Sequence, residues 1–128
     1  ACRYDHPLAR KTHLSWQAYF EQDYIGLDRV SGNRTLLDRE LAHLTPARPS
    51  ICETRHVTTM LGMVEAGIGI AAVPAMSMPA GEHSVLRAVP LTDPVVTRTV
   101  GLIRLSGRIQ SYVAAELEKL IIEQYPSG

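Results

Sequence analysis

The sequence predicts an α/β protein, a three-layer sandwich with helices on both faces of a mainly parallel sheet. Three observations carry this prediction. Short apolar runs alternate with amphipathic helical patterns, and linkers of only a few residues join them. Residues 53–74 contain a loop, a helical pattern, a glycine turn and an unbroken apolar run. The length of 128 residues is enough for one domain with a real core.

The helix within residues 53–74 is predicted from apolar side chains that recur at i, i+3, i+4, i+7 and i+11. These side chains are Val57, Met60, Leu61, Val64 and Ile68. We expect Thr54 to be the N-cap and Gly67 to end the helix in the left-handed conformation. Gly62 in mid-helix costs about 1 kcal/mol relative to Ala, and close packing of helix on sheet would explain it. The apolar run 70–73 predicts a strand covered on both faces, which Pro74 ends.

The remaining elements follow from caps, turns and periodicity. Ser15 is expected to cap a short helix that places Trp16, Tyr19 and Phe20 on one side. In chain order the other predictions are a strand at 24–27, a helix at 34–44, a strand at 50–53, a helical turn at 74–78, a loop at 79–83, strands at 85–91 and 97–105, and a helix at 109–125.

Composition excludes several classes of function. Thirteen basic and thirteen acidic side chains cancel, which argues against nucleic-acid binding through bulk charge. A single Phe and a single Trp disfavour a stacking platform for single strands. No apolar run reaches the roughly eighteen residues of a membrane span. Cys2 and Cys52 have no CxxC spacing, so we expect no disulfide framework and a reducing, cytoplasmic setting.

Metal, redox and catalytic interpretations find little support in the spacing. None of the five histidines stands in an HxxH or HExxH pattern, so no metal site is expected. The glycines of the 53–74 segment do not form GxGxxG, so neither a dinucleotide site nor any other cofactor is predicted. Cys52 and His56 could form a nucleophile and base, but Cys52 lies in a predicted strand where a small thiol packs well.

Two loops are better candidates for a binding site. Residues 28–33 and 53–57 each follow a predicted strand and open a helix. Helix starts offer unpaired N–H groups, to which the hydroxyls of Ser31 and Thr54 add donors. In a parallel sheet both loops lie at the carboxyl edge of the strands, where ligands usually bind. Simple helix capping is the alternative, and spacing alone does not decide between the two.

Four segments, in the same order, resemble the effector-binding region of LysR-type bacterial transcription regulators. They are DHPLA at 5–9, YIGLDRVSGNRTLLDREL at 24–41, TTMLGMVEAGIGIAAVP at 58–74 and VPLTDPVVTRTVGLIRLSGRIQSYVAAEL at 89–117. The third segment is similar to the family pattern xxLxxVxAGxGIxxLP. The resemblance covers nearly the whole chain.

The resemblance implies a Rossmann-like subdomain of the type II periplasmic-binding-protein fold. Residues 1–94 would be the second regulatory subdomain, the effector-binding half. Residues 95–128 would be the return strand and C-terminal helix of the first regulatory subdomain, whose remainder is expected to lie outside this chain together with the N-terminal helix-turn-helix. The tail helix would then expose an apolar stripe, which we expect to fold back onto the sheet or to swap into a second copy.

The resemblance further implies a small, anionic metabolite as effector, held in the cleft between the subdomains. The second subdomain would contribute Ser31, Gly32, Asn33, Thr54, His56 and Val57 to that cleft. DNA would be bound only through the helix-turn-helix, and the protein would be a homodimer or higher homo-oligomer in which residues 34–44 and 50–53 form contacts. Neither an enzymatic activity nor a membrane partner is expected. The alternative is a lobe of a periplasmic-type solute-binding protein, which shares this architecture.

Overall fold

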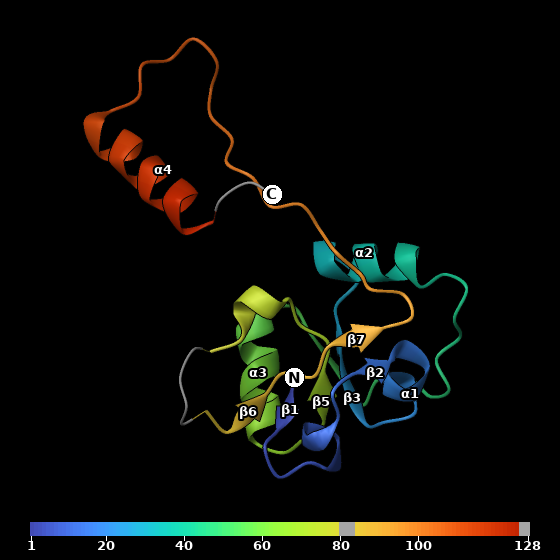
Figure 1. Ribbon diagram of the computed structural model, residues 1–128. Helices are drawn as coiled ribbons and strands as arrows, with labels where there is room; N and C mark the ends of the chain where they lie inside the picture. Colours follow the sequence, from blue (N-terminus) through green and yellow to red (C-terminus); the bar gives the residue numbers. More distant parts are fainter. Residues whose placement is uncertain (80–83, 126–128) are drawn as a thin grey trace. The chain divides into compact units, whose positions relative to one another are not determined.

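The computed structural model describes residues 1–79 and 84–125, and the chain forms two compact units, Ala1–Val96 (unit 1) and Thr97–Gly128 (unit 2). Figure 1 shows their elements. Unit 1 contains β1 (Cys2–Arg3), the 3₁₀ turn η1 (Pro7–Arg10), β2 (Leu14–Ser15), α1 (Trp16–Phe20), β3 (Tyr24–Leu27), α2 (Gly32–Glu40), β4 (Cys52–Thr54), α3 (Val57–Glu65), β5 (Ile70–Ala71), η2 (Ala75–Ser77), β6 (Leu86–Arg87) and β7 (Leu91–Thr92). Unit 2 contains α4 (Tyr112–Gln124).

The central sheet of unit 1 is parallel, as predicted. Its strand order is β4-β3-β5, with Ile25 opposite Cys52 and Tyr24 opposite Ile70. Two hydrogen bonds between Ala1 and Ala71 bring β1 alongside β5, and β1 pairs antiparallel with β6. A separate parallel pair joins β2 to β7.

Both faces of β3 are buried. Because alternate side chains point to opposite sides of a strand, each face packs against a different layer. Ile25 and Leu27 pack with Met60 and Val64 of α3. On the other face, Tyr24 packs into a cluster with side chains of α1 and with Leu41, which directly follows α2. Figure 1 shows α3 on one side of these strands and α1 on the other. The three-layer arrangement that the sequence predicts is therefore present within unit 1.

Several local predictions are confirmed. The strand 24–27 has the predicted bounds, and Cys52 lies in a strand. The Ser15 hydroxyl caps α1 by accepting a hydrogen bond from the Ala18 N–H at 3.2 Å. Gly67 has a φ of +78° and follows α3 in the left-handed conformation, which is costly for side chains with a Cβ.

The N-cap prediction for α3 is wrong. Thr54 is the last residue of β4, and the N-cap position falls on His56, two residues later. The reason is strand pairing: Thr54 stands opposite Leu27, so its backbone belongs to the sheet. The helix correspondingly ends at Glu65, which leaves Ile68 46% exposed instead of on the buried face.

The packing explanation for Gly62 is also wrong, because a Cβ at this position would have no atom within 4 Å. Gly62 lies on the exposed side of α3, while Met60 and Val64 make the contacts with the sheet.

Some predicted strands and helices are shorter in the structure or are not formed. The 85–91 strand is replaced by the two short strands β6 and β7, and residues 97–105 contain no strand. Within the predicted strand 70–73, only the residues of β5 pair with a neighbouring strand. The predicted helix 34–44 becomes α2, which starts at Gly32 and ends at Glu40, and the 50–53 strand becomes β4. Residues 80–83 of the predicted loop, including His83, lie outside the described residues.

Unit 2 is an extended segment followed by α4. The Ser111 hydroxyl caps this helix by accepting a hydrogen bond from the Ala114 N–H at 3.3 Å. Of the five side chains of the predicted apolar stripe, Tyr112, Val113, Leu117 and Leu120 are 57% to 80% exposed, whereas Ile121 is half-buried. Which surface covers this stripe in the protein stays a prediction.

Tyr19 offers a test of the packing in unit 1. Its hydroxyl accepts a hydrogen bond from the Ala72 N–H at 3.1 Å, and the side chain is buried. We expect Tyr19→Phe to lower the free energy of unfolding by about 1–3 kcal/mol, because the Ala72 N–H is left unpaired. Urea unfolding measures this loss, with Tyr4→Phe, at an exposed residue, as the control.

The stability difference between the native protein and Tyr19→Phe should also depend on pH. Burial raises the pKa of Tyr19 above its ordinary value, so the stability contributed by its proton is fully present below about pH 10. As the pH rises further, the unfolded state ionises first and the native protein loses this contribution. The stability difference between native protein and Tyr19→Phe should therefore shrink above about pH 10. A difference that stays constant there would contradict the assignment.

Candidate functional site

The two loops predicted from the sequence lie side by side at the same edge of the sheet. β3 and β4 run parallel with Leu27 opposite Thr54, and the Asp28 N–H donates to the Thr54 carbonyl at 3.0 Å. Residues 28–31 and 55–56 therefore leave the carboxyl ends of neighbouring strands together. This is the edge at which parallel α/β sheets bind ligands.

Both loops end in a helix start that has no side-chain cap. Ser31 is the N-cap of α2 and His56 that of α3, and in the described part of the chain neither accepts a capping hydrogen bond through its side chain. Neither helix start is therefore closed by the side chain of its N-cap residue, as the alternative of simple capping would require. Two uncapped helix starts side by side suit an anion, because both helix dipoles are positive at this end.

Charged side chains fix the geometry of these turns. One oxygen of the Asp28 carboxylate accepts from the Val30 N–H at 2.7 Å, and the other lies 3.5 Å from the Arg55 guanidinium. Arg34 donates to the Leu27 carbonyl at 3.0 Å and to the Glu53 carboxylate at 3.4 Å. Arg55 and Arg34 therefore tie the β3 side of this edge to the β4 side.

Arg34 is the positioning residue that the sequence prediction missed. Its guanidinium also donates to the Asp38 carboxylate at 2.7 Å, and this hydrogen bond raises the pKa of Arg34, which is therefore fully charged. The i,i+4 spacing of Arg34 and Asp38 is visible in the sequence as a helical ion pair. The contacts with Leu27 and Glu53 depend on strand register and carry no such signal.

The six predicted residues come together at this edge in two groups. Ser31, Gly32 and Asn33 open α2, while Thr54, His56 and Val57 span the end of β4 and the start of α3. Gly32 and His56 are exposed, and the other four are half-buried.

A cavity of about 530 Å³ lies elsewhere in unit 1, between α2, the loop that follows it and the central sheet. None of the six predicted residues lines it. Arg34 and Glu53 lie on its border, so this cavity and the loop edge share the polar contact between α2 and β4.

No group of three or more metal-ligating side chains occurs within residues 1–79 and 84–125. The same residues contain no helix long and apolar enough to cross a membrane.

Comparison with known proteins identifies the family of this chain. The family model described as the LysR substrate binding domain matches residues 1–126. The uncharacterized HTH-type transcriptional regulator YbhD of Escherichia coli (strain K12) is 41% identical over 122 residues, covering 95% of this chain and 38% of YbhD. The uncharacterized HTH-type transcriptional regulator YfeR of Shigella flexneri is 35% identical over 96% of this chain and 40% of YfeR. The chain thus spans about two fifths of these relatives.

Among solved structures, the effector binding domain of QuiR in complex with shikimate superposes with a TM-score of 0.64. The match covers 96% of this chain and 58% of the QuiR domain at 21% identity, so it shows the fold. The parallel sheet and its two covered faces agree with the type II periplasmic-binding-protein fold of that domain. The chain belongs to the LysR substrate-binding domain family. Because its relatives YbhD and YfeR are HTH-type transcriptional regulators, this family is favoured over the alternative of a lobe of a solute-binding protein.

Proposed function

We propose that this domain senses a small anionic metabolite for a LysR-type transcriptional regulator and has no catalytic activity. The observation that carries the proposal is the pair of uncapped helix starts, joined by the hydrogen bond from the Asp28 N–H to the Thr54 carbonyl at 3.0 Å. QuiR supports the ligand class, since its effector-binding domain takes shikimate, a carboxylate.

Each predicted residue has a role in this proposal. The N–H group of Gly32 and the hydroxyls of Ser31 and Thr54 hold the carboxylate, Asn33 and His56 add polar contacts, and Val57 packs against the apolar part of the ligand. Asp28 would repel an anion, and its pairing with Arg55 offsets this charge. Residues of the first regulatory subdomain, which lie mostly outside this chain, complete the cleft.

Ligand binding would change the angle between the two subdomains of the full protein and so the spacing of its DNA-binding helix-turn-helix domains in a cytoplasmic homodimer. Residues 1–94 act as the second subdomain and residues 95–128 as part of the first. α2 and β4 contribute to the dimer contacts. The apolar stripe of α4 would be covered by the first subdomain of the same protein, or else by the sheet or by a second copy.

Alanine substitution at the helix starts tests the ligand site. In the full regulator we expect Ser31→Ala and Thr54→Ala each to weaken carboxylate binding by about five- to tenfold, the equivalent of about 1 kcal/mol for one lost hydrogen bond. Isothermal titration calorimetry with shikimate and a panel of monocarboxylic acids measures the affinities.

Thr12→Ala is the matched control, because this exposed threonine precedes β2 and lies outside both turns. Unchanged affinity in both turn variants would refute the assignment of these residues. The same conclusion follows for the anion class if no carboxylate binds and a neutral ligand does.

A further inference from the structure

Most cations of unit 1 are paired with a neighbouring carboxylate. Unit 1 contains nine Lys and Arg side chains, and five of them contact Asp or Glu at 2.7–3.5 Å. Such pairs form even on open surface, since the side chain of Arg39 is 73% exposed. Of the other four, Arg29 lies in the turn after β3. Arg10, Lys11 and Arg87 remain, and none of them forms an ion pair in the part of the chain that the structure describes.

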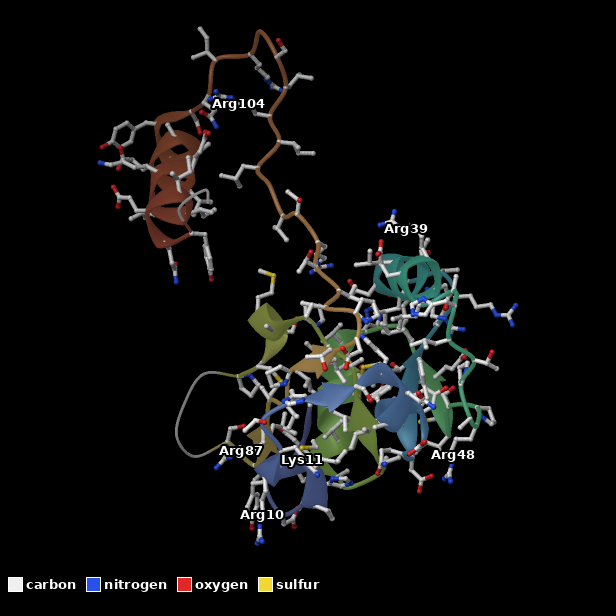
Figure 2. All side chains as sticks on the ribbon, turned by 45° about the vertical axis from the view of Figure 1, so that its right-hand side comes forward. Arg10, Lys11, Arg39, Arg48, Arg87 and Arg104 are labelled. Atoms are coloured by element: carbon white, nitrogen blue, oxygen red, sulfur yellow. The ribbon has the colours of Figure 1, made fainter. Side chains whose placement is uncertain are left out.

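The fold brings these three cations to one surface, which we call the basic patch. Arg10 ends η1, Lys11 follows it, and Arg87 lies in β6. Arg87 stands directly opposite Cys2 of β1, so the two side chains leave the ladder on the same face. Cys2 belongs to the buried cluster against which the apolar side chains of η1 pack. Figure 2 shows all three cations at the same end of unit 1, away from the other cations of this unit that it labels.

The basic patch and the two turns of the candidate effector site lie at opposite ends of α3. This helix begins beside the turns at Val57 and ends at Glu65. The Arg3 guanidinium donates to the Glu65 carbonyl at 2.6 Å, which places the end of β1, and η1 after it, at the far end of the helix. Nine helical residues span about 13 Å. A partner on the basic patch therefore leaves the turns open to an effector.

The arrangement of the basic patch favours an extended anion over a small one. All three side chains are exposed, and they come from two separate elements. A small anion would meet one exposed cation at a time, and a single ion pair in water contributes little. A polyanion with regularly spaced charges meets all three, relieves the repulsion between them and releases its own counterions.

The relatives of the chain indicate which polyanion is at hand. YbhD and YfeR are HTH-type transcriptional regulators, and this chain spans about two fifths of each. In the function proposed above, on which this inference rests, a helix-turn-helix holds DNA on the same molecule. Even a weak second contact then gains from the high local concentration of the tethered duplex.

We propose that the basic patch contacts the phosphate backbone of the DNA to which the regulator is bound. Arg10, Lys11 and Arg87 would each pair with a phosphate. Such contacts raise affinity and orient the domain on the duplex, but they carry no sequence information. The charges of the whole chain cancel, so the attraction is local to this surface.

The salt dependence of DNA binding tests the basic patch, because each phosphate contact adds about 0.9 to the slope of log K against log salt. In the full regulator, we expect Arg10→Gln combined with Lys11→Gln to reduce this slope by about 1.8, and Arg87→Gln to reduce it by about 0.9. Fluorescence anisotropy with a labelled duplex of arbitrary sequence, about 60 base pairs long, measures affinities between about 50 and 200 mM KCl.

Arg48→Gln combined with Arg104→Gln is the matched control. It removes two charges from exposed side chains that are paired with Asp23 and Glu118, and it should keep the native slope. The two patch variants lie in different elements, so a fold defect in one leaves the other informative. Neither should change the carboxylate affinities of the turns.

A native salt slope in both patch variants overturns the inference and leaves the proposed function intact. An equal loss of slope in the control would assign the effect to net charge and would also overturn it. Loss of poly-glutamate binding by the patch variants, with a native slope on DNA, would assign the surface to an acidic protein instead. A regulator that binds no duplex in any form refutes the proposed function and this inference together.

Discussion

Gly69→Ala is expected to destabilise unit 1 by about 3 kcal/mol, the upper part of the range for overpacking a core. A Cβ at position 69 would lie 2.5 Å from the carbonyl oxygen of Asp23 and 3.1 Å from the Ile51 side chain. The Asp23 oxygen cannot move away cheaply, because it accepts the Ile70 N–H at 2.9 Å where β5 joins β3. Relief of the clash would therefore open the start of the central sheet. Urea unfolding of the 128-residue chain measures the loss.

Gly62→Ala is the matched control, with the same added methyl group and the opposite expectation. The position lies within α3 and a Cβ there meets open space, so the variant should gain about 0.5–1 kcal/mol from the better helix propensity of Ala. If both variants lost stability equally, close approach at Gly69 would not be the cause. If Gly69→Ala were neutral, the close approach of Gly69 to the Asp23 carbonyl would be refuted.

These two glycines show what the sequence could and could not predict about the fold. Periodicity located α3 and the strand 24–27, because the buried side chains themselves form the pattern. Whether a position requires glycine depends on which atoms of distant residues lie close to it. For Gly69 these atoms belong to the backbone of residue 23. The clean pattern of residues 97–105 predicted a strand, yet a strand needs a partner for its backbone, and no such ladder forms within the described residues.

The candidate site was predictable in position and less so in detail. Alternation of strands and helices was enough to place the two loops at one sheet edge, because parallel strands end on the same side. The exact start of α3 could not be predicted, because the pairing of Thr54 with Leu27 decides where β4 ends. The contacts of Arg34 with Leu27 and Glu53 were missed because they depend on how α2 and the neighbouring strands come together, which the sequence pattern does not show.

Trp16→Ala is expected to lower the free energy of unfolding by about 3–5 kcal/mol, as large aromatic truncations in cores do. The side chain is only 3% exposed and packs against Tyr19 and Phe20 with ring centroids 5.6 and 6.0 Å away. Its indole N–H also donates to the Pro94 carbonyl at 2.9 Å, and so holds the segment that leads out of unit 1. Urea unfolding followed by circular dichroism measures the effect without relying on the Trp signal.

Trp16→Phe separates the two contributions, because it keeps most of the buried apolar surface and removes the hydrogen bond. We expect this variant to lose about 1–2 kcal/mol, with the difference from Trp16→Ala reflecting packing. Val30→Ala removes an apolar side chain that is 71% exposed in the turn after β3, so it should stay within about 0.5 kcal/mol of the native chain. If Trp16→Ala cost no more than this control, Trp16 could not anchor the core.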